Sequence, residues 1–106
     1  MIKVIFFKKG DSITGFELSG HSGYSDEGSD IVCSAVSSVA YMVANTITEI
    51  IGVDAAISLD DGYMKLIPEK VTEEIQMLFK GMALHFNALA QQYESYLCCK
   101  EKLFKE

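Results

Sequence analysis

Two segments of this sequence carry apolar residues at steps of three and four, and this spacing constrains the fold more than any other feature. The pattern gives a helix one apolar face, which other parts of the chain must cover. Asp30, or Ser29 one place earlier, is the predicted N-cap of the first helix, and Gly52 its predicted end. The spaced residues are Val32, Val36, Val39, Val43, Ile47 and Ile50 in the first segment, and Val71, Ile75, Leu78, Met82, Phe86, Leu89, Tyr93 and Tyr96 in the second.

Each helical segment follows two short runs that are typical of β-strands. Residues 2–7 and 12–18 flank Gly10-Asp11, and residues 55–59 and 63–67 flank Asp60-Asp61-Gly62, so both pairs predict a β-hairpin. The order β-β-α-β-β-α predicts an α+β two-layer sandwich, with two helices packed on a small, mostly antiparallel sheet. The charged tail, residues 100–106, is expected to be frayed. The expected aromatic core residues are Phe6, Phe7, Phe16, Phe79 and Phe86.

Length and charge restrict the class of protein further. The 106 residues, 49% of them hydrophobic, predict one domain over residues 1–106. No apolar run approaches the roughly 18 residues that span a bilayer, and the start lacks a secretory signal, so we expect a cytoplasmic protein with no membrane partner. A net charge of −6 argues against direct nucleic-acid binding and favours a basic partner. Three cysteines, an odd number, indicate free thiols.

A glycine- and serine-rich stretch joins the first hairpin to the first helix, and its composition predicts an exposed loop. Its acidic residues form either a solvated loop or a rim that attracts a cationic peptide. We treat the stretch as a candidate substrate loop, made of Gly20, Ser22, Gly23, Tyr24, Asp26, Glu27, Gly28 and Ser29.

The two ends of this loop carry groups suited to nucleophilic catalysis. A thiol at Cys33, in the first turn of a helix, meets the positive end of the helix dipole, which favours the thiolate. If the loop folds back, the His21 imidazole can pair with that sulfur and protonate a leaving amine. Free first-turn amides could hold an oxyanion, and Asp30 could cap the helix or orient the imidazole. The alternative is a small buried Cys33 beside a solvated His21.

Other candidates have a weaker basis. Cys98-Cys99 fall late in the second predicted helix, at its negative end, and are expected to be structural. His85 lies beside the apolar stripe and is expected to be packed or on the surface. These residues and the site pair show no CxxC or HxxxH spacing, so no metal site and no cofactor is expected.

The stretches GHSGY and GSDIVCSAVSS resemble the signature of the bacterial ribosomal-processing cysteine protease family, Prp. The resemblance implies that His21 and Cys33 are the catalytic pair and that Asp30 occupies an acidic position of the motif. Ser22 and Ser34 stand where the family pattern has alanine. The resemblance is specific over residues 20–38 and general over the rest of the chain.

This resemblance implies a homodimeric endopeptidase of Firmicutes and related bacteria. Its substrate would be the short N-terminal extension of a large-subunit ribosomal protein, the twenty-seventh of the series, cut after a pair of aromatic residues. An acidic protein suits a basic ribosomal partner. The competing hypothesis is a non-enzymatic, ribosome-associated binding module that uses the acidic loop, residues 20–30, with Cys33 merely packed.

Overall fold

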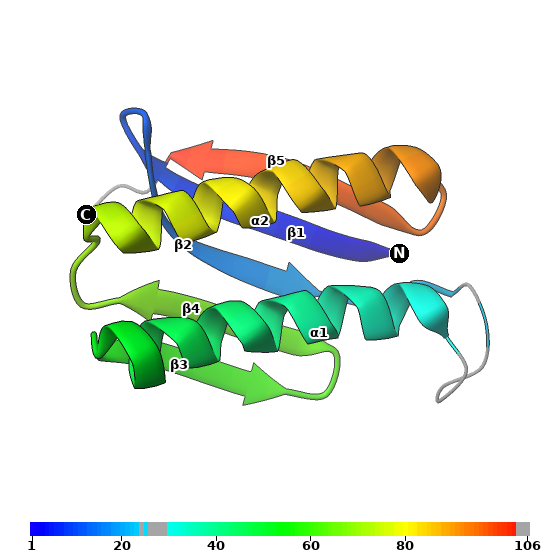
Figure 1. Ribbon diagram of the computed structural model, residues 1–106. Helices are drawn as coiled ribbons and strands as arrows, with labels where there is room; N and C mark the ends of the chain where they lie inside the picture. The colour runs from blue at the N-terminus through cyan, green and yellow to red at the C-terminus, as the bar shows by residue number, and fades with distance from the viewer. Residues whose placement is uncertain (24, 26–29, 104–106) are drawn as a thin grey trace.

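The computed structural model describes residues 1–23, 25 and 30–103, which form one sheet with two helices on one of its faces (Figure 1). The predicted two-layer α+β sandwich is confirmed. The sheet has five strands in the order β3-β4-β2-β1-β5. The elements are β1 (Ile2–Lys9), β2 (Ser12–Ser19), α1 (Ile31–Asn45), the π-helical turn η1 (Thr46–Ile51), β3 (Ala55–Asp60), β4 (Tyr63–Pro68), α2 (Glu73–Gln92) and β5 (Leu97–Leu103).

Both predicted hairpins form, and they lie side by side in the sheet. β1 pairs with β2 and β3 with β4, in each case antiparallel, and β2 joins the two hairpins by pairing with β4. In that last pairing Ser19, at the end of β2, lies opposite Tyr63, at the start of β4. The residues that follow β2 therefore emerge beside the β3–β4 turn.

The C-terminal part of the chain differs from the sequence prediction. α2 ends at Gln92 rather than near Tyr96, and residues 97–103 form β5, which pairs in parallel with β1. Cys98 and Cys99 thus lie on an edge strand, not at the end of a helix. The apolar spacing suggested a longer helix because Tyr93 and Tyr96 continue it. The partner of β5 is β1, at the opposite end of the sequence, so no neighbouring residues indicated a strand here.

The first helix begins and ends where the sequence predicted. Asp30 is its N-cap, and the chain leaves η1 at Gly52, whose φ of 81° lies in the left-handed region that favours glycine. The amides of Gly52 and Val53 both donate to the carbonyl of Ile47, at 3.0 Å. This wide last turn changes the direction of the apolar stripe, since Ile47 is buried whereas Ile50 is 79% exposed.

Contrary to the expectation from apolar runs, Ile31–Ile51 is long and apolar enough to cross a membrane by length and composition alone. A core helix of a globular domain meets the same two criteria. Here Val32, Val36 and Val43 are buried in the core that the helix shares with the sheet. We therefore interpret this segment as a core helix.

The core lies between the sheet and the helices, and Phe6, Phe16, Phe79 and Phe86 belong to it as predicted. Phe7 is buried but lies outside this cluster, with Lys65 Nζ 5.5 Å from its ring centroid. Phe16 and Phe79 pack edge to face at a centroid distance of 6.1 Å, linking β2 to α2. The buried aromatic side chains are Phe6, Phe7, Phe16, Phe79 and Phe86.

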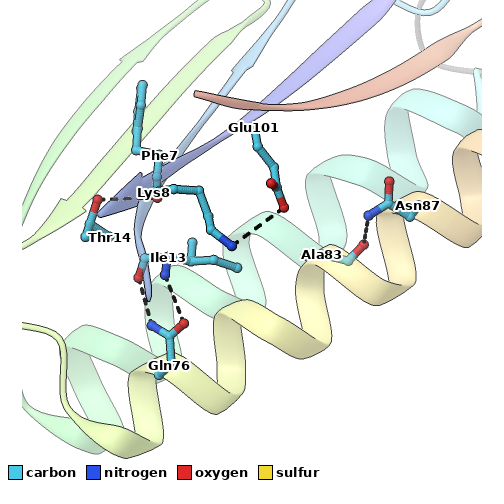
Figure 2. A network of polar contacts seen from close by, with 8 residues as sticks. All are labelled: Phe7, Lys8, Ile13, Thr14, Gln76, Ala83, Asn87 and Glu101. Atoms are coloured by element: carbon cyan, nitrogen blue, oxygen red, sulfur yellow. Dashed lines mark hydrogen bonds and ion pairs between the residues drawn. The ribbon is translucent and has the colours of Figure 1, made fainter. Parts of the chain in front are cut away.

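A polar contact also joins α2 to the first hairpin (Figure 2). The pairing of β1 with β2 shifts after Phe7, leaving Thr14 as the extra residue of a β-bulge. At this bulge the Gln76 side chain bonds both backbone groups of Ile13: its Oε1 accepts from the amide and its Nε2 donates to the carbonyl, each at 2.9 Å. The Gln76 side chain thus provides hydrogen-bond partners for the Ile13 amide and carbonyl at the bulge between β1 and β2.

Candidate active site

A cleft of about 590 Å³ lies between the start of α1, the end of β2 and the β3–β4 turn. His21 and Cys33 both line it, so the structure brings the two predicted catalytic residues to one cavity. Its lining also contains Gly20, Gly23, Ser25, Asp30, Ser34, Ser37, Tyr41, Asp60, Asp61, Gly62 and Tyr63. A cavity of this size, open to solvent and carrying both groups, suits a peptide substrate.

Asp30 holds the first turn of α1 in place. The residue is 5% exposed, and its Oδ1 accepts hydrogen bonds from the amides of Val32 and Cys33, each at 3.0 Å. Oδ2 accepts from the Ser22 hydroxyl. Burial alone raises the pKa of Asp30, but the hydrogen bonds from Ser22, Cys33 and Val32 together hold it below the ordinary value. Of the two roles that the sequence left open for Asp30, the structure shows the cap.

Cys33 is half-buried and faces the cleft, so its sulfur is not sealed in the core. The amide of Ser22 donates to the sulfur at a distance of 3.4 Å. A hydrogen bond of this kind becomes stronger whenever the acceptor sulfur carries a negative charge. In turn, the Cys33 thiol donates a hydrogen bond to the Asp30 carboxylate, which can only accept.

The expectation that free first-turn amides of α1 would hold an oxyanion is wrong for three of them. The amides of Val32 and Cys33 donate to the Asp30 carboxylate, and that of Ser34 donates to the Asp30 carbonyl at 3.1 Å. A capped helix has these donors occupied, and the cap residue that the sequence identified is the reason.

His21 stands at the edge of the cleft next to the β3–β4 turn. The amide of the preceding Gly20 donates to the Gly62 carbonyl at 2.9 Å, which ties the start of the loop to this turn. The His21 Nε2 lies 4.0 Å from Asp61 Oδ2, an ion pair when the imidazole is protonated. In the described part of the chain, Asp30 makes no hydrogen bond to His21.

Ser22 has a role that the sequence did not indicate. It is buried, and it connects to both Asp30 through its hydroxyl and Cys33 through its amide. An alanine at this position would lack that hydroxyl. The remaining predicted loop residues, Tyr24, Asp26, Glu27, Gly28 and Ser29, lie outside the described residues.

The other candidates lie away from the cleft lining. His85 is exposed on α2, which fits the expected surface histidine. Cys98 and Cys99 are half-buried on β5, and burial, with a smaller contribution from Cys98, raises the pKa of Cys99 to about 11. Over the described residues, no group of three or more His, Cys, Asp or Glu side chains is placed to hold a metal ion.

A half-buried thiol at the first turn of a helix, facing a cleft that an imidazole also lines, is compatible with the chemistry of a cysteine protease. The family described as "Cysteine protease Prp" matches residues 1–98 of this chain. The chain belongs to this family, and it is a cysteine protease. The competing hypothesis of a non-enzymatic binding module is therefore wrong.

Comparisons with individual proteins agree with this assignment. The Ribosomal processing cysteine protease Prp of Bacillus subtilis is 27% identical over 92 residues, which cover 80% of this chain and 82% of the relative. The SMU.848 protein of Streptococcus mutans is 29% identical, with a TM-score of 0.84 over 98% of this chain and 96% of its own.

The same fold occurs in a crystal structure of a Staphylococcus aureus protein, the essential ribosomal processing protease Prp with a covalently linked product peptide. Its TM-score is 0.89 at 23% identity, over 96% of this chain and all of that one. A second crystal structure of the S. aureus protease, with a substrate peptide, has a TM-score of 0.83 at 22% identity.

Proposed function

We propose that this chain removes the short N-terminal extension of a large-subunit ribosomal protein, the twenty-seventh of the series, with Cys33 as nucleophile and His21 as general acid and base. The observation that carries the proposal is that both side chains line one cleft of about 590 Å³. The B. subtilis relative is named for ribosomal processing, and the S. aureus protease was crystallised with a substrate peptide. The net charge of −6 suits a basic ribosomal substrate.

The proposed reaction is acyl transfer in two steps. The Cys33 thiolate attacks the peptide carbonyl carbon, and the C–N bond breaks as protonated His21 gives its proton to the departing amine. His21 then takes a proton from water, whose oxygen attacks the thioester carbon and releases the acid and the thiolate. The Ser22 amide, 3.4 Å from the sulfur, supports the charged sulfur at the start and the end of this cycle.

We further propose a homodimer in the cytoplasm, as the family resemblance implies. Large apolar side chains on the outer side of the helices, among them Met42, Met77 and Leu84, are exposed in a single copy of the chain. Light scattering after size-exclusion chromatography checks the dimer, and a monomeric mass at all concentrations contradicts it. Fractionation of the source cell checks the compartment.

The reaction is tested with a peptide that carries the ribosomal-protein extension. Cys33→Ala is expected to abolish its cleavage because no other group replaces the nucleophile. His21→Ala is expected to lower kcat/KM by about 10²- to 10⁴-fold, the usual contribution of general acid–base catalysis. Cys98→Ala, a half-buried thiol on β5, serves as the matched control and should retain activity. Cleavage by Cys33→Ala at the wild-type rate contradicts the assignment of the nucleophile.

A further inference from the structure

The β3–β4 turn, Asp61-Gly62, reaches the cleft and lies against the residue proposed as the catalytic base. The pairing of β2 with β4 ends at Ser19 and Tyr63, immediately beside this turn. The hydrogen bond from the Gly20 amide to the Gly62 carbonyl continues the contact by one more residue. The backbone that carries His21 is therefore attached to the second hairpin before the loop begins.

The imidazole of His21 packs on the face of Gly62. A side-chain carbon built at position 62 would lie 2.8 Å from Nε2 and 3.2 Å from Cε1 of the ring. Real β-carbons do not approach other atoms to 2.8 Å, so a side chain at position 62 would push the exposed His21 ring out of this position. Gly62 also has a φ of +65°, as its turn requires.

Asp61 adds charge to this contact. Its Oδ2 lies 4.0 Å from Nε2, but the His21 and Asp61 side chains are 60% and 87% exposed. An ion pair this open to water contributes little energy, so we expect Asp61 to add only a modest effect to the contact of the ring with Gly62. Because Nε2 is the nitrogen that faces Asp61 and the turn, Nδ1 is the nitrogen left for the Cys33 sulfur; a Ser-His-Asp triad uses the two nitrogens the other way round, with Nε2 toward the nucleophile and Nδ1 toward the aspartate.

We propose that Asp61 and Gly62 are positioning residues for the His21 imidazole. The ring packs on Gly62, and the Asp61 carboxylate faces its Nε2. This inference rests on the proposed function, in which His21 is the general acid and base. It assigns to the second hairpin, rather than to Asp30, the task of orienting the imidazole.

The chain offers a matched pair of glycines for the test. Gly10, in the β1–β2 turn, has a φ of +62° and open space around the position of an added side chain, so Gly10→Ala introduces the same backbone strain without touching His21. Gly62→Ala should lower kcat for the extension peptide by at least about tenfold relative to Gly10→Ala, since small displacements of a catalytic group are costly. KM and the thermal midpoints of the two variants should stay close.

A second pair of variants preserves the backbone and changes only charge. Asp61→Asn should lower kcat/KM about threefold in low salt, while Asp11→Asn, the same charge change in the β1–β2 turn, should have no effect. In 1 M NaCl the wild type and Asp61→Asn should converge, because salt screens an exposed pair. A purely structural role of Asp61 does not predict this convergence.

The outcomes separate this inference from the proposed function. If Cys33→Ala is inactive but Gly62→Ala matches Gly10→Ala in kcat and Asp61→Asn matches the wild type in low salt, the positioning role is wrong and the catalytic pair stands. If Cys33→Ala still cleaves the peptide, the proposed function fails first. Should Gly62→Ala not fold, the two aspartate variants decide the question alone.

Discussion

Cys33 and Cys99 are both half-buried, yet their surroundings set them apart chemically. Cys33 faces the cleft and accepts a hydrogen bond from the Ser22 amide. Burial and the neighbouring Cys98 raise the pKa of Cys99 to about 11. The thiolate is the species that alkylating reagents attack, so the two sulfurs should differ strongly in reactivity.

We therefore predict that iodoacetamide modifies Cys33 well before Cys99 in the native protein. With a pKa of about 11, only roughly one Cys99 side chain in a thousand is ionised at pH 8. Peptide mapping by mass spectrometry over a time course measures both rates in one sample. Equal rates in the folded protein, or faster labelling of Cys99, would contradict the assignment of Cys33 as the reactive thiol; unfolding in urea should equalise the two.

The buried Asp30 carboxylate also leads to an expectation about how stability depends on pH. Its folded-state pKa is lowered, so its contribution to stability is present above the unfolded value of about 4 and is lost as the pH falls below it. Asp30→Ala should cost about 1 to 2 kcal/mol at pH 7 because the N-cap is lost. Urea unfolding followed by circular dichroism at pH 7 and pH 3 should show a smaller difference between wild type and variant at pH 3.

The control for Asp30 is Asp54→Asn, an exposed aspartate in the turn before β3. It should leave both the stability and its pH dependence unchanged. Asp30→Asn retains an oxygen that can accept from the first-turn amides, so it should recover most of the cap while removing the pH dependence. An Asp30→Asn protein that loses stability in acid as steeply as the wild type would show that other carboxylates dominate.

Among the elements, α2 is fixed to the first hairpin by one polar side chain. Gln76→Ala removes both hydrogen bonds to Ile13 and leaves a partly buried amide and carbonyl at the β-bulge without that partner. We expect a loss of about 2 kcal/mol in the free energy of unfolding. Urea titration measures it, and faster hydrogen exchange at the Ile13 amide locates it. Gln91→Ala, exposed on the same helix, should change stability by less than about 0.5 kcal/mol; equal losses in the two variants would contradict the role of Gln76.

Local sequence patterns predicted the elements whose determinants are local. The N-cap at Asp30, the helix end at Gly52 and the Asp60-Asp61-Gly62 turn each depend on neighbouring residues, and each is confirmed. The exposure of Ile50 was not predicted, because the wide turn of η1 changes the helical period. No short window of sequence reports such a change.

The residues that line the cleft also include some that the sequence predicted and some that it did not. His21 and Cys33 could be found from their motif, since the loop and the helix start that carry them are adjacent in sequence. The place of Asp61 and Gly62 beside His21 could not, because it results from the pairing of β2 with β4. The buried hydroxyl of Ser22 was likewise hidden, since only the folded loop brings it to Asp30.

The first and last strands of the sheet in sequence order, β1 and β5, pair with each other. β5 lies in parallel beside β1, with Leu97 opposite Ile2, and the Ile2 amide donates to the Tyr96 carbonyl at 2.9 Å. This pairing gives β1 a partner on both sides and leaves β3 and β5 as the edges of the sheet. The paired residues of β1 and β5 lie about as far apart in the sequence as any two strands of this sheet. Bringing them together therefore has a high cost in chain entropy.

The pairing of β5 with β1 should contribute substantially to the free energy of unfolding. Leu97 is 1% exposed within the core, whereas Leu103, on the same strand, is 67% exposed. Leu97→Ala should therefore cost about 2 to 5 kcal/mol through the cavity it leaves, and Leu103→Ala less than about 0.5 kcal/mol. Urea unfolding of both variants measures the contrast. If residues 97–103 did not pack on the rest of the fold, the two changes would be equally mild. A large loss at Leu97 alone means that the C-terminal strand belongs to the same cooperative unit as the cleft, because Ile2, its partner in β1, also lines that cleft.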